Sequence, residues 1–373
     1  MQALRIIVCV LTVIMTLLTL LPLSKNQRWW VRVWDFPRLQ MVSLCLLFLL
    51  TELLILPFDG VLTGIVIILT VACMAYQGWW ILPYTRLYRV QVKKTVPNGH
   101  SRIKIMNSNV LTTNRESAQL LSQIQEHKPD IIVLLETDQW WEDQMAPLEA
   151  DYPHSLRCPL DNLYGMHVYS RLPMHGEQIQ FLVAKDIPSM HFRAELPSGE
   201  QVVLHCLHPR PPSPTEADES TARDGELIAV GHTAAKAHFP TIVTGDLNDV
   251  AWSRTTRLFM KISGLLDPRR GRGMYNTFHA SYPFLRWPLD HVFHSKDFTL
   301  IDLKRLDFMG SDHFPILVEL ALTPCQGKDQ EPLEIENDDL EEAREKLELA
   351  GVKLTDIYPA NKKQANNEPA NNK

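Results

Sequence analysis

The segment Thr241–Asp249 contains two side chains whose types and spacing suit chemistry. An apolar run stops at Gly245 and is followed by Asp246 and Asn248, a carboxylate and a carboxamide two positions apart. Side chains in an extended segment alternate between two faces, so these two point the same way. A buried strand that ends in such groups is a common position for a site in α/β proteins. A strand followed by an ordinary turn explains the same residues, because Gly, Asp and Asn are turn formers.

The same pattern recurs at five other places in the chain, where an apolar segment meets one or two polar side chains. A single Asp or His at the end of a strand is more often a cap or a surface residue than a site residue. Six repetitions within one segment of the chain favour a shared site. The residues concerned are Asn109, Glu136, His208, Asp246 with Asn248, Asp290 with His291, and Asp312 with His313.

The residue types in this set indicate a hard cation and acid–base chemistry. Carboxylates and carboxamides without cysteine ligands suit Mg²⁺ or Mn²⁺. A histidine beside an aspartate suits proton transfer near neutral pH. A cation held by one or two carboxylates keeps open positions that can bind a phosphate oxygen. The chain has no Gly-x-Ser-x-Gly elbow, P-loop or dinucleotide fingerprint, which argues against acyl transfer, nucleotide hydrolysis and hydride transfer. Hydrolysis of a phosphate ester is therefore the chemistry that the residues favour.

The composition of the 373-residue chain sets limits on its class. Acidic residues number 43 against 37 basic ones, and the excess lies in the central segment 97–327 and the tail. The central segment is long enough for one large domain with a substantial core. Its acidic balance makes it a poor candidate for charge-driven nucleic-acid binding. The 6 cysteines show no paired spacing, so we expect neither a disulfide framework nor a zinc site.

The first part of the chain, 1–96, predicts a membrane region with three transmembrane helices. Apolar runs cover about 3–23, 39–57 and 61–82, and about 20 residues of helix cross a bilayer core. Tryptophans and tyrosines stand near their ends, as interfacial aromatic residues do. A cleaved signal peptide is the alternative for the first run, but its length and the lack of a small-x-small site argue against it. Glu52 interrupts the second run, and we expect it to face the bundle or an interface.

Basic residues in the short loops predict the orientation of these helices. Four lie between the first and second runs and four follow the third: Lys25, Arg28, Arg32, Arg38, Arg86, Arg89, Lys93 and Lys94. The positive-inside rule places both groups, and the following domain, in the cytoplasm. We therefore expect an integral protein of a bacterial inner membrane with a cytoplasmic catalytic domain. Loss of one span would invert this orientation.

Two further segments follow the membrane region. In 97–327 the patterns predict strands over 102–110, 130–135, 166–169, 191–196, 201–207, 241–245, 285–294 and 315–322, and helices over 116–126 and 222–237. In 328–373 an acidic helix is predicted between Asn337 and Gly351, with a disordered end beyond Pro359. We expect this acidic tail to be solvated.

Six short motifs in this order resemble the endonuclease/exonuclease/phosphatase superfamily of metal-dependent phosphoesterases. They are Ile105–Val110, Asp130–Thr137, Leu204–Pro209, Gly245–Asn248, Pro288–Phe293 and Gly310–Pro315. The resemblance covers about 100–322. It implies an α/β (α+β) fold, a four-layer αββα sandwich of two packed mixed sheets preceded here by the three transmembrane helices, with the site at one edge of the sheets.

The resemblance also implies roles for residues on both sides of the site. Glu136 would be the principal metal ligand, with Asn109 beside it, and the ion would be Mg²⁺ or Mn²⁺. His313 would be the general base that activates water, and Asp312 its orienting partner.

The remaining predicted residues would face the substrate. His208 would stabilise a phosphoryl oxygen or assist the leaving group, and Asp246 and Asn248 would position the nucleophile and the scissile phosphate. Asp290 would be structural or on the phosphate side. Arg254 belongs to an arginine cluster (with Arg257, Arg269, Arg270 and Arg272) that could collect an anionic substrate; a solvated helix and loop is the alternative.

The sequence thus predicts a membrane-anchored, divalent-metal-dependent hydrolase of phosphate esters. Its substrate would be a lipid head group, favoured by the anchor, or a nucleic acid, favoured by the arginine cluster. A catalytically inactive, membrane-tethered binding module of the same fold is the alternative from another functional class.

Overall fold

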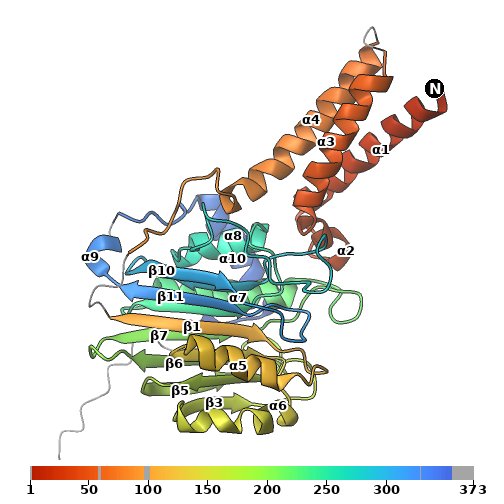
Figure 1. Ribbon diagram of the computed structural model, residues 1–373. Coiled ribbons are helices and arrows are strands. Elements are labelled where there is room, and N and C mark those ends of the chain that lie inside the picture. Colours follow the sequence, from red (N-terminus) through yellow and green to blue (C-terminus); the bar gives the residue numbers. More distant parts are fainter. Residues whose placement is uncertain (1, 58–59, 96–100, 328, 355–373) are drawn as a thin grey trace, which may run out of the picture.

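The structure is a computed structural model that describes residues 2–57, 60–95, 101–327 and 329–354. It consists of a sandwich of two β-sheets with helices outside them, and of long helices that leave one side of the sandwich (Figure 1). The predicted disordered end beyond Pro359 lies outside the described residues.

The first sheet has six strands in the order β10-β11-β1-β2-β4-β3. The strands β1 and β2 pair in parallel, and the other neighbours are antiparallel. Their bounds are Arg102–Asn109 (β1), Ile131–Leu135 (β2), His154–Cys158 (β3), Met166–Ser170 (β4), Phe298–Arg305 (β10) and Ile316–Leu322 (β11).

The second sheet has five strands in the order β5-β6-β7-β8-β9. The strands β7 and β8 are parallel, and the other pairs are antiparallel. Their bounds are Met174–Gln180 (β5), Ser189–Glu195 (β6), Gln201–Leu207 (β7), Thr241–Asp246 (β8) and Asp290–His294 (β9). Both sheets are mixed, as the sequence predicted.

The two sheets pack face to face because each central strand is apolar on both sides. In β1, Ile105 points into the core between the sheets, whereas Met106 points to the outer helices. In β8, Ile242 and Val243 divide in the same way. Strands buried on both faces need helices outside them. The predicted four-layer αββα sandwich is therefore confirmed.

Helices cover both outer faces of the sandwich. The first sheet is covered by α5 (Ser117–His127) and α6 (Gln139–Gln144), with the 3₁₀ turn η4 (Ala146–Ala150). The second sheet is covered by α7 (Thr221–Ala235) and α8 (Arg254–Ser263). A short helix, α9 (Pro324–Gly327), follows β11. The sequence did not predict β3, β5, β10, α6 or α9, and it indicated a helix at α8 only as one alternative for the arginine cluster.

The acidic tail contains the predicted helix, α10 (Asn337–Ala350), but that helix is docked on α7 and α8. Ala343 is 1% exposed and Leu347 9%, and both pack against the apolar outer side of α7 and α8. The Lys346 Nζ donates to Asp224 of α7 at 2.6 Å. The expectation of a solvated tail is wrong for this helix, because its apolar stripe has a partner.

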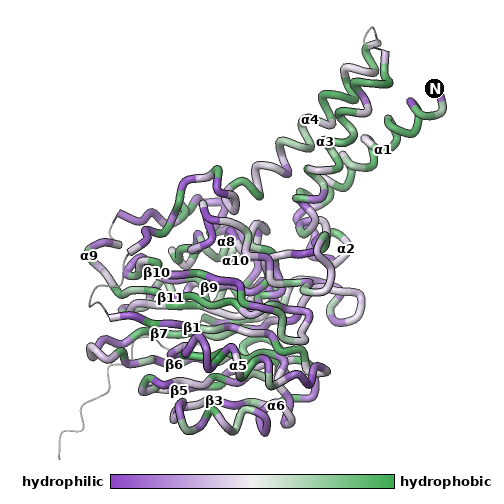
Figure 2. The backbone as a smooth tube through the Cα atoms, in the orientation of Figure 1, coloured by the Kyte–Doolittle hydropathy of each residue, from purple (hydrophilic) through white to green (hydrophobic). Residues whose placement is uncertain are grey.

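Three segments at the start of the chain are long and apolar enough to cross a membrane: Gln2–Ser24, Arg38–Ile55 and Val61–Tyr84. They comprise α1 (Gln2–Leu20) with the turn η1 (Leu21–Ser24), α3 (Arg38–Ile55), and α4 (Val61–Ile81) with the turn η3 (Leu82–Tyr84). Figure 2 shows these helices as the apolar projection of the molecule. The short elements α2 (Trp29–Arg32) and η2 (Val33–Asp35) lie between α1 and α3.

The buried carboxylate Glu52 joins the three long helices. Its Oε1 accepts hydrogen bonds from the hydroxyls of Thr12 in α1 and Thr70 in α4, both at 2.7 Å. Glu52 faces the bundle, as the sequence predicted.

Hydrogen bonds also fasten the helical region to the sandwich. The Trp252 Nε1 donates to the carbonyl of Asp35 at 2.9 Å, and the Tyr84 hydroxyl donates to the carbonyl of Ala251 at 2.6 Å. Both contacts fall on the loop that follows β8.

Candidate active site

The topology brings six strand ends to one edge of the sandwich. The strands β1 and β2 run in parallel and end at Asn109 and Leu135, which pair in register, so Glu136 follows at the same edge. The strand β9 runs against β8, and its first residue, Asp290, pairs with Asp246, the last residue of β8. His208 follows β7, and His313 precedes β11.

Asn109 links the two sheets at the centre of this edge. Its Nδ2 donates to Glu136 Oε1 at 2.7 Å and to Asp246 Oδ2 at 3.2 Å. Asn109 and Asp246 are each 1% exposed. One carboxamide thus holds two carboxylates from different sheets side by side. This pair of oxygens is the kind of ligand set that a hard divalent cation prefers.

Glu136 has an uncommon backbone conformation and a half-buried carboxyl group that is difficult to ionise. Its backbone has a φ of 60°, a conformation uncommon for residues other than glycine. Burial raises the pKa of its carboxyl to about 7, Asp312 and Asp246 add to the rise, and Asn109 and His313 oppose it. A carboxylate that is costly to ionise in this environment would be stabilised by a cation.

The imidazole of His313 is oriented by Asp290. Its Nδ1 lies 2.8 Å from Asp290 Oδ2, and its Nε2 lies 3.4 Å from Asp246 Oδ2. The sequence-based assignment of Asp312 as the orienting partner is therefore wrong. Asp312 is half-buried beside the site, and its Oδ1 accepts a long hydrogen bond of 3.4 Å from Ser311.

Asn107 completes this arrangement, and the sequence missed its contribution. Its Nδ2 donates to Asp290 Oδ1 at 2.9 Å, across the two sheets. Both oxygens of Asp290 are thereby engaged, one by Asn107 and one by His313. The spacing of Asn107 and Asn109 on β1 was the available signal, because residues two apart on a strand face the same side.

The charge state of His313 follows from its neighbours. Burial by itself would lower the pKa of His313, but Asp290 and Asp246 outweigh burial and raise the pKa to about 10. Among these side chains, the protonated His313 balances part of the negative charge of Asp290 and Asp246.

His208 approaches the same oxygen of Asp246 as His313 does, and it differs from His313 in charge. Its Nε2 lies 3.9 Å from Asp246 Oδ2, and burial lowers the pKa of His208 to about 4. The ring of Tyr164 lies 5.2 Å from the His208 ring, centroid to centroid. The site therefore contains one neutral and one protonated imidazole near the same carboxylate oxygen.

The turn after β8 is fixed by its backbone. Asn248 has a φ of 50°, its N–H donates to Asp246 Oδ1 at 2.9 Å, and its Nδ2 donates to the carbonyl of Pro209 at 3.0 Å. Gly245 has a φ of 147°, and a Cβ there would collide with the carbonyl oxygen of Leu207. Only glycine allows β7 and β8 to approach this closely just before the site.

Two predicted residues lie away from the site. Arg254 Nε donates to Glu342 of α10 at 2.8 Å, so the proposed substrate role of Arg254 is replaced by a contact between α8 and the tail helix. His291 follows Asp290 in the strand and points to the other face. There its Nδ1 lies 2.7 Å from Arg269, whose Nη1 also donates to the carbonyl of Asp290 at 3.2 Å.

The donor set fits a metal ion. Asp246, Asp290 and His313 are buried and offer ligand atoms that all lie within 4.8 Å of one another. Asn109 contacts an oxygen of Asp246 as well and links it to Glu136. Buried carboxylates in such a group repel one another and need positive charge beyond one imidazolium.

Comparisons with known proteins agree with the motifs. The model of the Endonuclease/Exonuclease/phosphatase family matches residues 99–313. No curated protein matches the chain. A solved endonuclease/exonuclease/phosphatase from Beutenbergia cavernae DSM 12333 is 19% identical and covers 60% of this chain and 72% of its own, with a TM-score of 0.48.

Two further solved structures are similar over the same region. TDP2 of D. rerio, complexed with a single-strand DNA product, is 17% identical and covers 59% of this chain and 99% of its own, with a TM-score of 0.49. The catalytic domain of human Nocturnin, with a bound sulfate anion, is 18% identical and covers 61% of this chain and 97% of its own, with a TM-score of 0.48. With the family model matching most of the chain, the conclusion is that this protein belongs to the endonuclease/exonuclease/phosphatase family.

Proposed function

We propose that the protein is a membrane-anchored phosphoesterase that depends on Mg²⁺ or Mn²⁺ and uses His313 to activate water. The observation that carries this proposal is the convergence of Asp290, His313 and Asp246 on the pair Glu136–Asn109 at one edge of the sandwich. Members of this family are usually hydrolytic phosphoesterases or nucleases. An inactive binding module would have no chemical need for this whole arrangement.

Glu136, Asn109 and Asp246 would hold the cation. When bound, a divalent ion would act as a Lewis acid on a phosphate oxygen, and its charge would oppose protonation of His313. Asp290 holds Nδ1 of His313, which leaves Nε2 directed into the site as the atom that takes a proton from water.

The substrate side of the site would be formed by His208 and Asn248. His208 is neutral at physiological pH, so its ring can donate one hydrogen bond to a phosphoryl oxygen and still change protonation state during the reaction. Asn248 is fixed by its backbone and by Pro209. Its position beside Asp246 suits orientation of the scissile phosphate.

A lipid head group is the substrate class that the structure favours over a nucleic acid. Ala280 donates its N–H to the carbonyl of Asp312 at 2.6 Å, and Gln40 in the first turn of α3 donates to the carbonyl of Phe284 at 2.7 Å. One loop therefore joins the site to the start of an apolar helix. In that loop Tyr282 is 57% and Phe284 89% exposed, as expected of side chains that contact a membrane rather than water.

The test is hydrolysis by the full-length protein in lipid nanodiscs. Phospholipids, single-stranded DNA and bis-p-nitrophenyl phosphate would be offered with Mg²⁺, with Mn²⁺ and with excess EDTA. We expect turnover of a phosphoester that EDTA abolishes and added Mg²⁺ restores. His313→Ala should reduce turnover by about 10²–10⁴-fold, whereas His175→Ala, the same change on the edge strand β5, should leave it unchanged.

Three outcomes would contradict the proposal. Full turnover in the presence of EDTA would exclude the cation, and full turnover of His313→Ala would show that another group activates water. A folded protein that hydrolyses none of the three phosphoesters would refute the enzyme assignment. Preference for DNA over every lipid would redirect the substrate class.

A further inference from the structure

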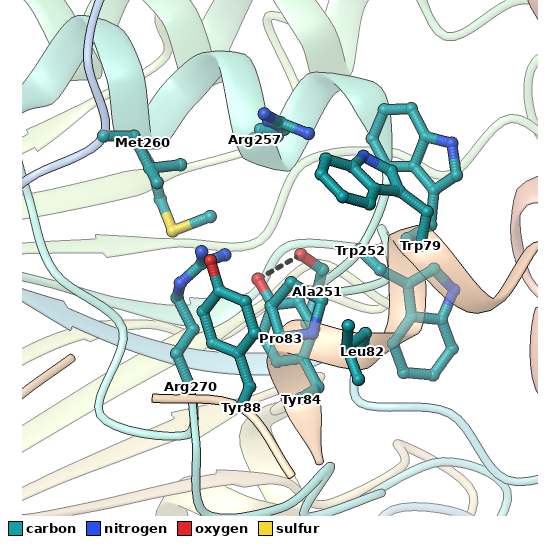
Figure 3. Close-up of a pocket in the computed structure, with 12 residues that line it drawn as sticks. Trp79, Leu82, Pro83, Tyr84, Tyr88, Ala251, Trp252, Arg257, Met260 and Arg270 are labelled. Carbon is teal, nitrogen blue, oxygen red and sulfur yellow. Dashed lines mark hydrogen bonds between the residues drawn. The ribbon is translucent and has the colours of Figure 1, made fainter. Parts of the chain in front are cut away.

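A pocket separate from the proposed active site lies where α4 meets the sandwich. It contains about 550 Å³ of empty space, counting its open mouth. Its walls come from the end of α4, from η3 and from α8 with the loops beside it (Figure 3). The residues that matter for its chemistry are Trp79, Trp80, Tyr84, Tyr88, Arg257 and Arg270. None of the residues proposed for catalysis lines it.

The two arginines of this pocket have aromatic neighbours rather than carboxylate partners. The Arg257 guanidinium lies 5.6 Å from the centre of the Trp80 ring. The Arg270 guanidinium lies 5.7 Å from the Tyr84 ring and 5.6 Å from the Tyr88 ring. Within the described parts of the chain, neither arginine forms an ion pair. Arg254, one turn before Arg257, is by contrast paired with Glu342.

Within the described part of the chain, Arg270 and Trp80 each have a buried N–H group without an acceptor in this pocket. Arg270 is 7% exposed, and its Nε has no hydrogen-bond partner among residues 2–57, 60–95, 101–327 and 329–354. The Trp80 Nε1, also buried, lacks one as well. A buried guanidinium donor without an acceptor is costly. An anionic group with several oxygens would supply the missing acceptors.

The position of the pocket identifies the kind of anion. Trp79 is 65% exposed and Ile68, further up the same helix, 68%, so an apolar surface of α4 leads directly to the mouth of the pocket. Tryptophan and tyrosine rings at the end of an apolar helix occupy the headgroup level of a bilayer. A ligand at this level would have an apolar part along α4 and an anionic part at the arginines.

We propose that this pocket binds the phosphate headgroup of an anionic phospholipid from the leaflet next to the sandwich, as a site distinct from the catalytic one. The forked guanidinium groups of Arg257 and Arg270 match phosphate oxygens, and the tryptophans line the part nearer the acyl chains. The inference rests on the proposed placement of α4 in a membrane. A bound lipid would also contact Ala251 and Trp252, which follow the Asp246 turn.

The experiment uses the full-length protein in nanodiscs of phosphatidylcholine with or without phosphatidylglycerol. Native mass spectrometry would count the lipids retained, and titration with a fluorescent phosphatidylglycerol would give the affinity. We expect one retained phosphatidylglycerol. Each Arg→Gln change at 257 or 270 should weaken binding by about tenfold or more, because each removes a charge-assisted hydrogen bond.

The matched control removes the same charge nearby. Arg86→Gln combined with Arg89→Gln changes two exposed arginines of the segment after η3, which do not line this pocket, and should leave the affinity unchanged. Arg257→Gln alone serves if the buried change at Arg270 disturbs folding, which thermal melting would detect.

Equal affinity of the Arg257→Gln/Arg270→Gln variant and the unchanged protein would refute the site, as would equal retention of phosphatidylcholine. Displacement of the lipid by inorganic phosphate at equal concentration would show a soluble-phosphate site instead. Flotation with liposomes and hydrolysis of bis-p-nitrophenyl phosphate, measured on the same samples, separate a failure of this inference from a failure of membrane anchoring or of catalysis.

Discussion

Replacement of Asp290 by asparagine tests the assignment of the residue that orients His313. Asparagine keeps the size of the side chain and removes its charge. The bond that it would weaken is the 2.8 Å contact between Asp290 Oδ2 and His313 Nδ1, which is fully buried. Hydrogen bonds to charged groups contribute about 1.5–3 kcal/mol, which corresponds to about 10–150-fold in rate.

A second loss adds to the first, because an asparagine amide can hold the ring in the wrong tautomer. We therefore expect kcat to fall by about 10²–10⁴-fold, which is the full contribution of a general base. Asp312→Asn should cost less than about tenfold, because Asp312 acts on the site only through its charge.

The assay is hydrolysis of bis-p-nitrophenyl phosphate by the full-length protein at saturating Mg²⁺, with thermal melting as the check on folding. His175→Ala is the control for the purification and for the substrate. A larger loss of kcat for Asp312→Asn than for Asp290→Asn would refute the reasoning and restore the sequence-based assignment. A raised KM with an unchanged kcat for Asp290→Asn would show that Asp290 contributes to substrate binding alone.

Four further predictions concern stability and topology. Burial raises the pKa of Glu226 in α7 from 4.5 to about 8. Between these two pH values the folded state keeps a proton that the unfolded state releases. The free energy of unfolding therefore falls as pH rises through this window, by about 5 kcal/mol at most. Glu226→Gln should flatten this dependence in thermal melts from pH 5 to 8, and an unchanged slope would contradict it. Gly245→Ala should destabilise the protein by about 3 kcal/mol or more, because its Cβ collides with Leu207 and its φ is positive; a Tm within a degree or two of the original, on the order expected for a neutral change, would be inconsistent with this. Lys346→Met should lower the free energy of unfolding by about 2 kcal/mol. The loss is smaller than for a fully broken buried ion pair, because Asp224 keeps its contact with Arg223 at 2.8 Å. A melting temperature equal to that of the unchanged protein would show that α10 is not docked on the sandwich. A reporter that is active only in the cytoplasm should be active when fused to the C-terminus, and one that is active only outside it should be silent. The reverse pattern would show the opposite orientation.

The strand ends could be predicted from sequence because each depends on a local pattern. An apolar run followed by Glu136, His208 or Asp246 predicts both a buried strand and the polar side chain at its end. The order of such motifs then indicated the αββα sandwich, which is confirmed. The partner of His313 could not be read in the same way. Asp312 is adjacent in sequence, whereas Asp290 reaches the ring only because β9 and β11 begin at the same edge of different sheets.

The same limit explains the errors outside the site. Arg254 and Glu342 are far apart in sequence, so nothing local to Arg254 indicated an ion pair. The tail helix had a visible apolar stripe, but its partner surface on α7 and α8 forms only in the folded sandwich. The missed strand β5 is largely polar and lies at the edge of its sheet, where an apolar pattern is weakest.

The bonds of Trp252 and Ala251 to Asp35 and Tyr84, together with the bond from Gln40 to Phe284, hold two different loops of the sandwich to the helices. A domain on a single flexible linker sweeps a hemisphere and can reach targets at many heights. A domain fixed at two points keeps one tilt and one height above the helices that carry it. If the helices lie in a membrane and the edge is catalytic, as proposed, the edge would move in a plane parallel to the bilayer. Encounter with a target would then depend on lateral diffusion and on the depth of the target's phosphate. A phosphate at another depth would be out of reach, however strong its affinity for the site.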